Sequence, residues 1–138
     1  MARLYTANVT SFGGRNGRVR SDDGNFELDL RPPGSTTDPD NKFVNPELLF
    51  AAAYSACFDS ALQSIIRTDK VGPIETSVKA SVSLDKSDDG KYTLAVTLAV
   101  AIPLIDRLLA KELMEKAHKK CPYSLAIKGN VEVKLVLV

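Results

Sequence analysis

The two cysteines of the chain, Cys57 and Cys121, are its candidate nucleophiles. Cys57 lies within an apolar, alanine-rich run, where a free cysteine often serves as a small buried hydrophobe. Burial would also raise the pKa of its thiol, so a reactive Cys57 needs a positive charge from another segment. Cys121 follows His118 and two lysines at an expected helix end and precedes Pro122. This position predicts an accessible thiol.

One buried thiol and one helix-end thiol suit a redox pair. The first is oxidised to a sulfenic acid, and the second condenses with it to a disulfide. Inert packing of Cys57 and a chance surface thiol at Cys121 are the alternatives.

Other chemistry is poorly supported by the residue types. Cys57, Cys121 and His118 give at most three zinc ligands, without close Cys-x-x-Cys spacing, so no metal site is expected. His118 would be the only base for a serine triad, and it suits the helix end better; the chain also has no Gly-x-Ser-x-Gly motif. The glycine-rich run 13–17 is too short to bind a nucleotide, so no bound cofactor is expected.

Length and composition predict one soluble domain spanning residues 1–138. The chain is 44% hydrophobic and 25% charged with a net charge of +1, and its basic residues are scattered, so no nucleic-acid partner is expected. There is no apolar N-terminal run, and polar residues interrupt the longest charge-free run. We therefore expect that this run falls short of a membrane span and that the protein is cytoplasmic.

The apolar run is predicted to be a central helix over residues 45–67, about 33 Å long. Asn45 is a suitable N-cap, Pro46 suits the first helical position, and Glu47 suits the first turn. Because this helix is apolar on nearly all sides, we expect it to be buried.

Strands and a second helix complete the expected elements. Strands are expected at residues 3–12, 17–21, 26–30, 74–84, 92–102 and 129–138, and a helix at 103–120. Residues 31–44 are expected to form an irregular loop. This order predicts an α+β fold with antiparallel sheets rather than alternating βαβ units. Two three-stranded sets give little cover for so apolar a helix, which favours a dimer around it.

Four motifs resemble those of the organic hydroperoxide resistance branch of the Ohr/OsmC family. They are Gly-Gly-Arg-Asn-Gly-Arg at 13–18, Asn-Pro-Glu-x-Leu-Phe-Ala-Ala-x-Tyr-Ser-Ala-Cys-Phe at 45–58, His-x-x-Cys-Pro-Tyr-Ser at 118–124 and Gly-Asn-Val at 129–131. The resemblance runs from the first expected strand to the last and implies an OsmC-like fold and an intertwined homodimer.

The resemblance also implies a thiol peroxidase that reduces organic hydroperoxides, including those of fatty acids, to alcohols. Cys57 matches the peroxidatic cysteine and Cys121 the resolving one. Arg15 matches the arginine that holds the thiolate, and Glu47 the carboxylate that orients this arginine. The implied reductant is an external dithiol of the lipoyl type, carried on lipoylated proteins.

Three aromatic residues, Phe50, Tyr54 and Phe58, are candidates for contacting an apolar peroxide, with core packing as the alternative. Leu125, Ile127 and residues 34–44 depart from the family pattern. A hydrophobic carrier with incidental thiols is the alternative function, although a carrier would need neither the cysteines nor Arg15 and Glu47. An OsmC-like relative that has lost its activity is disfavoured because all four of these residues are present.

Glu47 and Cys57 are ten residues apart, about 15 Å along a continuous helix. One arginine cannot easily reach both within such a helix. Either the helix is broken between them, or Arg15 and Glu47 come from the partner chain; we favour the second arrangement.

Overall fold

The computed structural model describes residues 1–138 and contains two compact units, Met1–Leu49 and Phe50–Val138. Helix α1 (Pro46–Thr68) begins in the first unit and continues through the second without a break. The side-chain oxygen of Asn45 accepts a hydrogen bond from the Leu48 N–H at 2.8 Å. The helix therefore starts at the residue that its capping signal predicts.

The first unit is built on an antiparallel sheet. Its strands are β1 (Val9–Phe12), β2 (Arg18–Ser21) and β3 (Glu27–Asp29), in the order β1-β2-β3. The first strand is shorter than the expected 3–12, because its partner β2 has only four residues to pair with it. The loop from 31 to 44 has no helix or strand, as expected.

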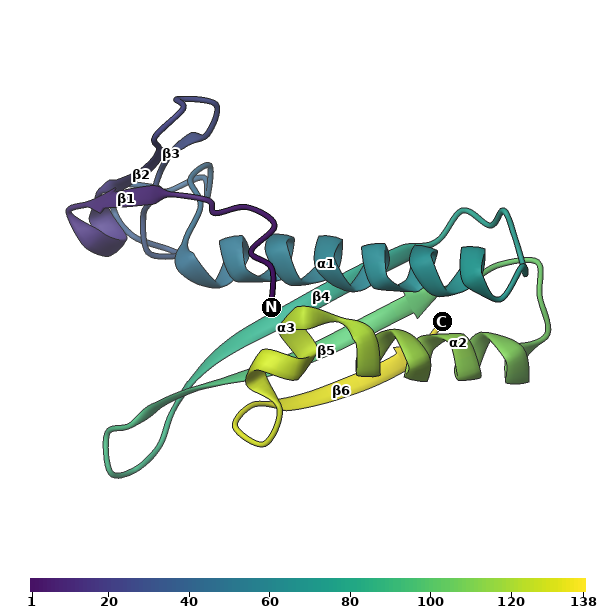
Figure 1. Ribbon diagram of the computed structural model, residues 1–138. Helices are drawn as coiled ribbons and strands as arrows, with labels where there is room; N and C mark the ends of the chain where they lie inside the picture. The colour runs from purple at the N-terminus through teal and green to yellow at the C-terminus, as the bar shows by residue number, and fades with distance from the viewer. The chain divides into compact units, whose positions relative to one another are not determined.

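A mixed sheet forms the centre of the second unit, in the order β4-β5-β6 (Figure 1). Its strands are β4 (Ser77–Lys86), β5 (Tyr92–Ala101) and β6 (Glu132–Leu137). The first two form the expected antiparallel hairpin, but β6 runs parallel to β5. The prediction of wholly antiparallel sheets is therefore wrong at this pair. Two helices connect β5 to β6, and such a crossover returns the chain to the same end of the sheet.

These two helices are α2 (Arg107–Lys120) and α3 (Pro122–Ile127). Helix α2 starts later than residue 103, because the Asp106 carboxylate caps it by accepting hydrogen bonds from the N–H groups of Leu108 and Leu109. Helix α3 was not expected. Pro122 ends α2 as predicted but also occupies the first position of α3, where its missing N–H costs nothing.

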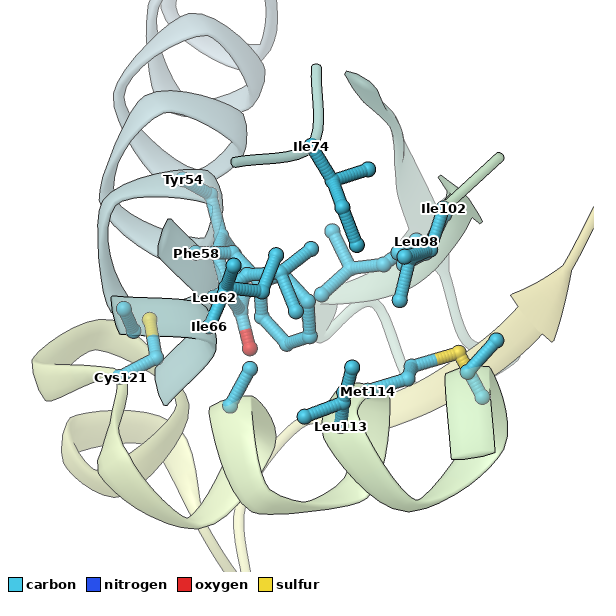
Figure 2. Packing of buried hydrophobic residues seen from close by; sticks show 14 of the residues in the cluster. Tyr54, Phe58, Leu62, Ile66, Ile74, Leu98, Ile102, Leu113, Met114 and Cys121 are labelled. Atoms are coloured by element: carbon cyan, nitrogen blue, oxygen red, sulfur yellow. The ribbon is translucent and has the colours of Figure 1, made fainter. Parts of the chain in front are cut away.

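The core of the second unit lies between α1, α2 and the sheet (Figure 2). Helix α1 contributes residues spaced three and four apart: Tyr54, Phe58, Ala61, Leu62 and Ile66. The opposite stripe of α1, with Ala52, Ala56 and Ser60, is exposed. In the single chain α1 is thus buried on one face, and not on nearly all sides as its composition predicts, because one sheet and one helix cover only one face.

By length and composition alone, α1 could cross a membrane, with a mean hydropathy of 1.3. The prediction that its apolar run falls short of a membrane span is therefore wrong by this criterion. A core helix passes the same test, and the buried stripe of α1 belongs to the core described above.

Candidate active site

A short turn positions Arg15 in the first unit. The 3₁₀ turn Gly14–Asn16 lies between two glycines, of which Gly13 has a left-handed backbone with φ of 76°. A Cβ atom on Gly17 would lie 1.6 Å from the carbonyl oxygen of Phe12, so only glycine fits there. The glycine-rich segment therefore forms a defined turn with Arg15 at its centre.

The guanidinium of Arg15 binds the carboxylate of Glu47 through two parallel hydrogen bonds. Nη1 donates to Oε2 at 2.8 Å, and Nη2 donates to Oε1 at 2.7 Å. This fork geometry is specific to arginine and fixes the plane of the guanidinium. The hydrogen bonds from Arg15 lower the pKa of Glu47 below its ordinary value, so the carboxylate is ionised at neutral pH. The structure thus brings together these two of the four predicted catalytic residues.

The two cysteines lie together in the second unit. Both are free, and the Cys121 Sγ donates a hydrogen bond to the Cys57 Sγ at 3.7 Å. A disulfide needs about 2.05 Å between the sulfurs, so an approach of about 1.7 Å would join them. Cys57 comes from the middle of α1 and Cys121 from the junction between α2 and α3. Residues 64 positions apart are therefore placed for disulfide formation.

Exposure of the two thiols is the reverse of the prediction. Cys121 is 0% exposed, whereas Cys57 is partly exposed. The prediction of an accessible Cys121 is wrong because α3 follows α2 directly and Cys121 belongs to the core cluster. The partly exposed Cys57 is thus the thiol that a substrate can reach in this unit.

Burial raises the pKa of the Cys57 thiol, and the neighbouring Cys121 raises it further. The backbone N–H of Tyr123 acts in the opposite direction. Within residues 50–138 none of these contributions comes from a cation. A reactive Cys57 therefore still needs a positive charge from outside residues 50–138, as the sequence predicts.

A hydrogen-bonded chain of three side chains lies on the same helices as the thiols. The hydroxyl of Tyr54 is 2.6 Å from the Ser124 Oγ, which in turn is 2.9 Å from the His118 Nδ1. Sequence reasoning missed Ser124 and assigned His118 only to a helix end. The sequence feature that could have identified these two residues is the spacing His-x-x-Cys-x-x-Ser, which places His118 and Ser124 on either side of Cys121.

The aromatic residues proposed to contact substrate do not form one accessible surface. Tyr54 and Phe58 are fully buried in the core, and Phe50 packs edge-to-face against Tyr54 with 6.0 Å between ring centroids. Their positions favour core packing in the single chain. No group of three or more His, Cys, Asp or Glu residues is placed to hold a metal ion.

The structure is that of an α+β protein with two free cysteines side by side, and comparison with known proteins gives its family. A family model described as OsmC-like protein matches residues 39–136. The organic hydroperoxide resistance protein OhrA of Bacillus subtilis is 48% identical over 135 residues, which cover 96% of this chain and 94% of OhrA. The chain therefore belongs to the OsmC-like family, in its group of organic hydroperoxide resistance proteins.

Solved structures agree with this assignment. The crystal structure of OhrB from Bacillus subtilis has a TM-score of 0.91 and 42% identity, covering 99% of this chain and all of that chain (100%). An organic hydroperoxide resistance protein from Elizabethkingia anophelis has a TM-score of 0.89 and 45% identity, covering 99% and 98%. The OsmC-like fold predicted from the motifs is confirmed.

Proposed function

We propose that this protein protects against organic peroxides by acting as a cysteine-based peroxidase that reduces organic hydroperoxides, including those of fatty acids, to alcohols. The observation that carries the proposal is the pair of free thiols 3.7 Å apart, in a chain whose relatives are named organic hydroperoxide resistance proteins. A protein that only carries an apolar ligand would not need two thiols at that distance.

In the proposed reaction the Cys57 thiolate attacks the distal oxygen of the peroxide. The O–O bond breaks, the alkoxide leaves and takes up a proton to become the alcohol, and Cys57 becomes a sulfenic acid. Cys121 then attacks the Cys57 sulfur, so an S–S bond forms and water leaves. An external dithiol of the lipoyl type would reduce this disulfide by exchange and become oxidised itself.

Arg15 is proposed to stabilise the Cys57 thiolate and the leaving alkoxide, with Glu47 orienting its guanidinium. Two observations support these roles: the fork between Arg15 and Glu47, and a Cys57 thiol whose surroundings in its own unit raise its pKa. A fixed guanidinium offers charge without reorganisation when negative charge develops. We further propose a homodimer, a cytoplasmic location and lipoylated proteins as the source of reductant.

The proposed function is tested by peroxide turnover with dihydrolipoamide as reductant. Wild type is expected to consume cumene hydroperoxide and fatty-acid hydroperoxide catalytically, whereas Cys57→Ser should lose at least about 10³-fold, because a serine hydroxyl at neutral pH is not an ionised nucleophile. Thr68→Ala, an exposed change at the end of the same helix, is the matched control. Unchanged consumption by Cys57→Ser would end the peroxidase proposal.

Cys121→Ser separates the two cysteine roles. We expect one equivalent of peroxide to be consumed per chain, followed by a stalled or over-oxidised Cys57, because no second thiol can trap the sulfenic acid. Mass spectrometry of the quenched protein would measure this product. Undiminished turnover with dihydrolipoamide would show that Cys121 is not an obligatory resolving residue.

A further inference from the structure

A second arginine of the first unit, Arg31, contacts the turn that carries Arg15. Its Nη1 donates hydrogen bonds to the backbone carbonyl of Asn16 at 3.0 Å and to that of Gly17 at 3.4 Å. The same nitrogen also donates to the carbonyl of Leu30. Because the guanidinium is charged, its hydrogen bonds to carbonyl oxygens are stronger than neutral ones. Arg31 therefore holds the backbone that directly follows Arg15.

The backbone of Arg31 is tied to the segment that leads into Glu47. The N–H of Arg31 donates to the Val44 carbonyl at 3.0 Å, next to the parallel β-bridge that joins Leu30 to Val44. Val44 lies three residues before Glu47, which is in the first turn of α1. Arg31 thus binds both segments that supply the fork. Its side chain holds the turn of Arg15, and its backbone holds the approach to α1.

The Arg31 guanidinium is itself held in place by the loop that follows it. Its Cζ lies 5.1 Å from the centroid of the Phe43 ring, a cation–π contact. The backbone of Phe43 is fixed by Asp38, whose carboxylate accepts hydrogen bonds from the N–H groups of Lys42 at 2.7 Å and Phe43 at 3.1 Å. Asp38 is 3% exposed. The guanidinium is therefore bound through its nitrogen by carbonyls and across its face by an aromatic ring.

The fork between Arg15 and Glu47 needs such support because it is open to water. The two side chains are 46% and 16% exposed. Ordering a long arginine side chain costs conformational entropy, and an exposed ion pair offsets little of that cost. The proposed role of Arg15 nevertheless requires a guanidinium that is in position before negative charge develops. A turn that Arg31 already holds leaves less freedom for the fork to remove.

We propose that Arg31 is a positioning residue for the peroxidase reaction, holding the turn of Arg15 so that its guanidinium is ready to stabilise the Cys57 thiolate and the leaving alkoxide. This inference rests on the proposed function. Arg31 acts only through Arg15, and it takes part in no bond-making step. The loss of Arg31 should therefore slow oxidation of Cys57 only while Arg15 is present.

The test is a double-mutant cycle on the rate constant for oxidation of Cys57. The reduced full-length protein is mixed with one equivalent of cumene hydroperoxide, quenched at intervals and analysed by mass spectrometry. Arg31→Met should react about 10-fold more slowly than wild type, since a misplacement of about 1 Å can cost about 10²-fold and a loosened turn still visits its native position. In an Arg15→Ala background the same change should have no further effect, because residues that act through one another are not additive.

Two further variants distinguish the hydrogen bonds of Arg31 from its charge. Arg31→Lys keeps one cationic nitrogen with three donors and should react within about 3-fold of wild type. Arg20→Met removes the same charge from an exposed position on β2 and should react as wild type does. Circular dichroism and urea unfolding check that each variant is folded. Arg31→Gln, which also lacks the cation, passes through the same cycle, so the inference is still tested if Arg31→Met does not fold.

The Arg15→Ala variant separates the inference from the function on which it rests. If Arg15→Ala oxidises Cys57 at the wild-type rate, the proposed role of Arg15 fails, and the role of Arg31 fails with it. If Arg15→Ala is slow but folded Arg31→Met and Arg31→Gln react as wild type does, Arg31 is not a positioning residue and the peroxidase proposal stands. Equal losses from Arg31→Met in both backgrounds, or losses as large in Arg31→Lys or Arg20→Met, would overturn the inference in the same way.

Discussion

At the scale of single residues, the exposure of the two thiols matches their proposed roles as the peroxidatic and the resolving cysteine. Cys57 is partly exposed and can meet a substrate, whereas Cys121 is fully buried and 3.7 Å away. A buried second thiol is protected from direct oxidation by peroxide in solution, because susceptibility follows thiolate character and exposure. It can still reach the oxidised sulfur through a short movement.

The fork between Arg15 and Glu47 gives a stability prediction. Because Arg15 lowers the folded-state pKa of Glu47, the pair contributes stability above the unfolded pKa of about 4.3 and loses it as pH falls through the folded value. Glu47→Gln should therefore reduce the free energy of unfolding at pH 6 by about 1 kcal/mol or less, since Arg15 is half-exposed, and by much less at pH 3.

Urea unfolding of wild type and Glu47→Gln at the two pH values measures this difference. Glu27→Gln is the matched control, since Glu27 pairs with Arg18 at 3.3 Å with both side chains about half exposed. Such a surface pair should contribute about 0.5 kcal/mol or less at either pH. A Glu47→Gln effect that does not shrink toward pH 3 would contradict the ion pair as its source.

The sequence pointed to both cysteines and to the pair Arg15 and Glu47 through motifs that resemble those of the family, and the structure places each of these two pairs in contact. It did not predict the hydrogen-bonded chain of Tyr54, Ser124 and His118, since Ser124 carries no charge and His118 has an ordinary position at a helix end. Neither could the burial of Cys121 be predicted, because exposure at a helix end depends on the segment that follows. These properties arise from packing between α1, α2 and α3.

At the scale of elements, the junction of α2 and α3 sets the position of the second thiol. Cys121 is both the last cap of α2 and the first cap of α3, with an extended backbone (φ −60°, ψ 120°). The residue before a proline is driven to this conformation, and the proline then starts the next helix. Pro122 therefore directs the Cys121 side chain toward the core.

Pro122→Ala should slow disulfide formation. Without the proline, α2 can continue through Cys121 and rotate its thiol away from Cys57, and a misplacement of about 1 Å can cost about 10²-fold in rate. After the reduced protein is mixed with one equivalent of cumene hydroperoxide, mass spectrometry of quenched samples should show slower disulfide formation with an unchanged rate of sulfenic acid formation. Pro103→Ala, exposed and outside the junction, is the control. Wild-type disulfide formation in Pro122→Ala would show that the proline does not position the thiol.

How well each helix and strand could be predicted depends on whether its sequence signal is local or involves distant segments of the chain. Helix α1 was predicted within one residue at each end because its cap and its apolar run are local. Helix α3 was missed because a proline was treated only as a stop. The parallel pairing of β5 and β6 was missed because it depends on where the whole α2–α3 connection returns the chain.

At the scale of the whole molecule, a single chain leaves apolar surface that a second copy would cover. The stripe of small residues on α1 is exposed, and several large apolar side chains are too: Leu4, Tyr5, Leu48, Leu104 and Leu108. Small residues permit close approach of two helices. This exposure supports the proposed homodimer, in which α1 would pack against its copy.

The continuity of helix α1 also helps to decide which chain supplies Arg15 to the site at Cys57. Of the two arrangements that its length allows, a break between Glu47 and Cys57 is not observed. We therefore propose that Arg15 and Glu47 of one chain serve Cys57 of the partner. In a two-fold symmetric dimer, two such sites would form, each with components from both chains.

Mixed dimers test this arrangement. Arg15→Ala and Cys57→Ser are each expected to be inactive as homodimers, but a mixed dimer keeps one complete site if the residues act across the interface. After random exchange of equal amounts, half of the dimers are mixed, so activity should return to about one quarter of wild type. An equal mixture of Arg15→Ala and Glu47→Ala is the control, since Arg15 and Glu47 pair within one chain and no complete site can form. Native mass spectrometry would verify the exchange; mixed dimers without activity would place Arg15 beside the cysteine of its own chain.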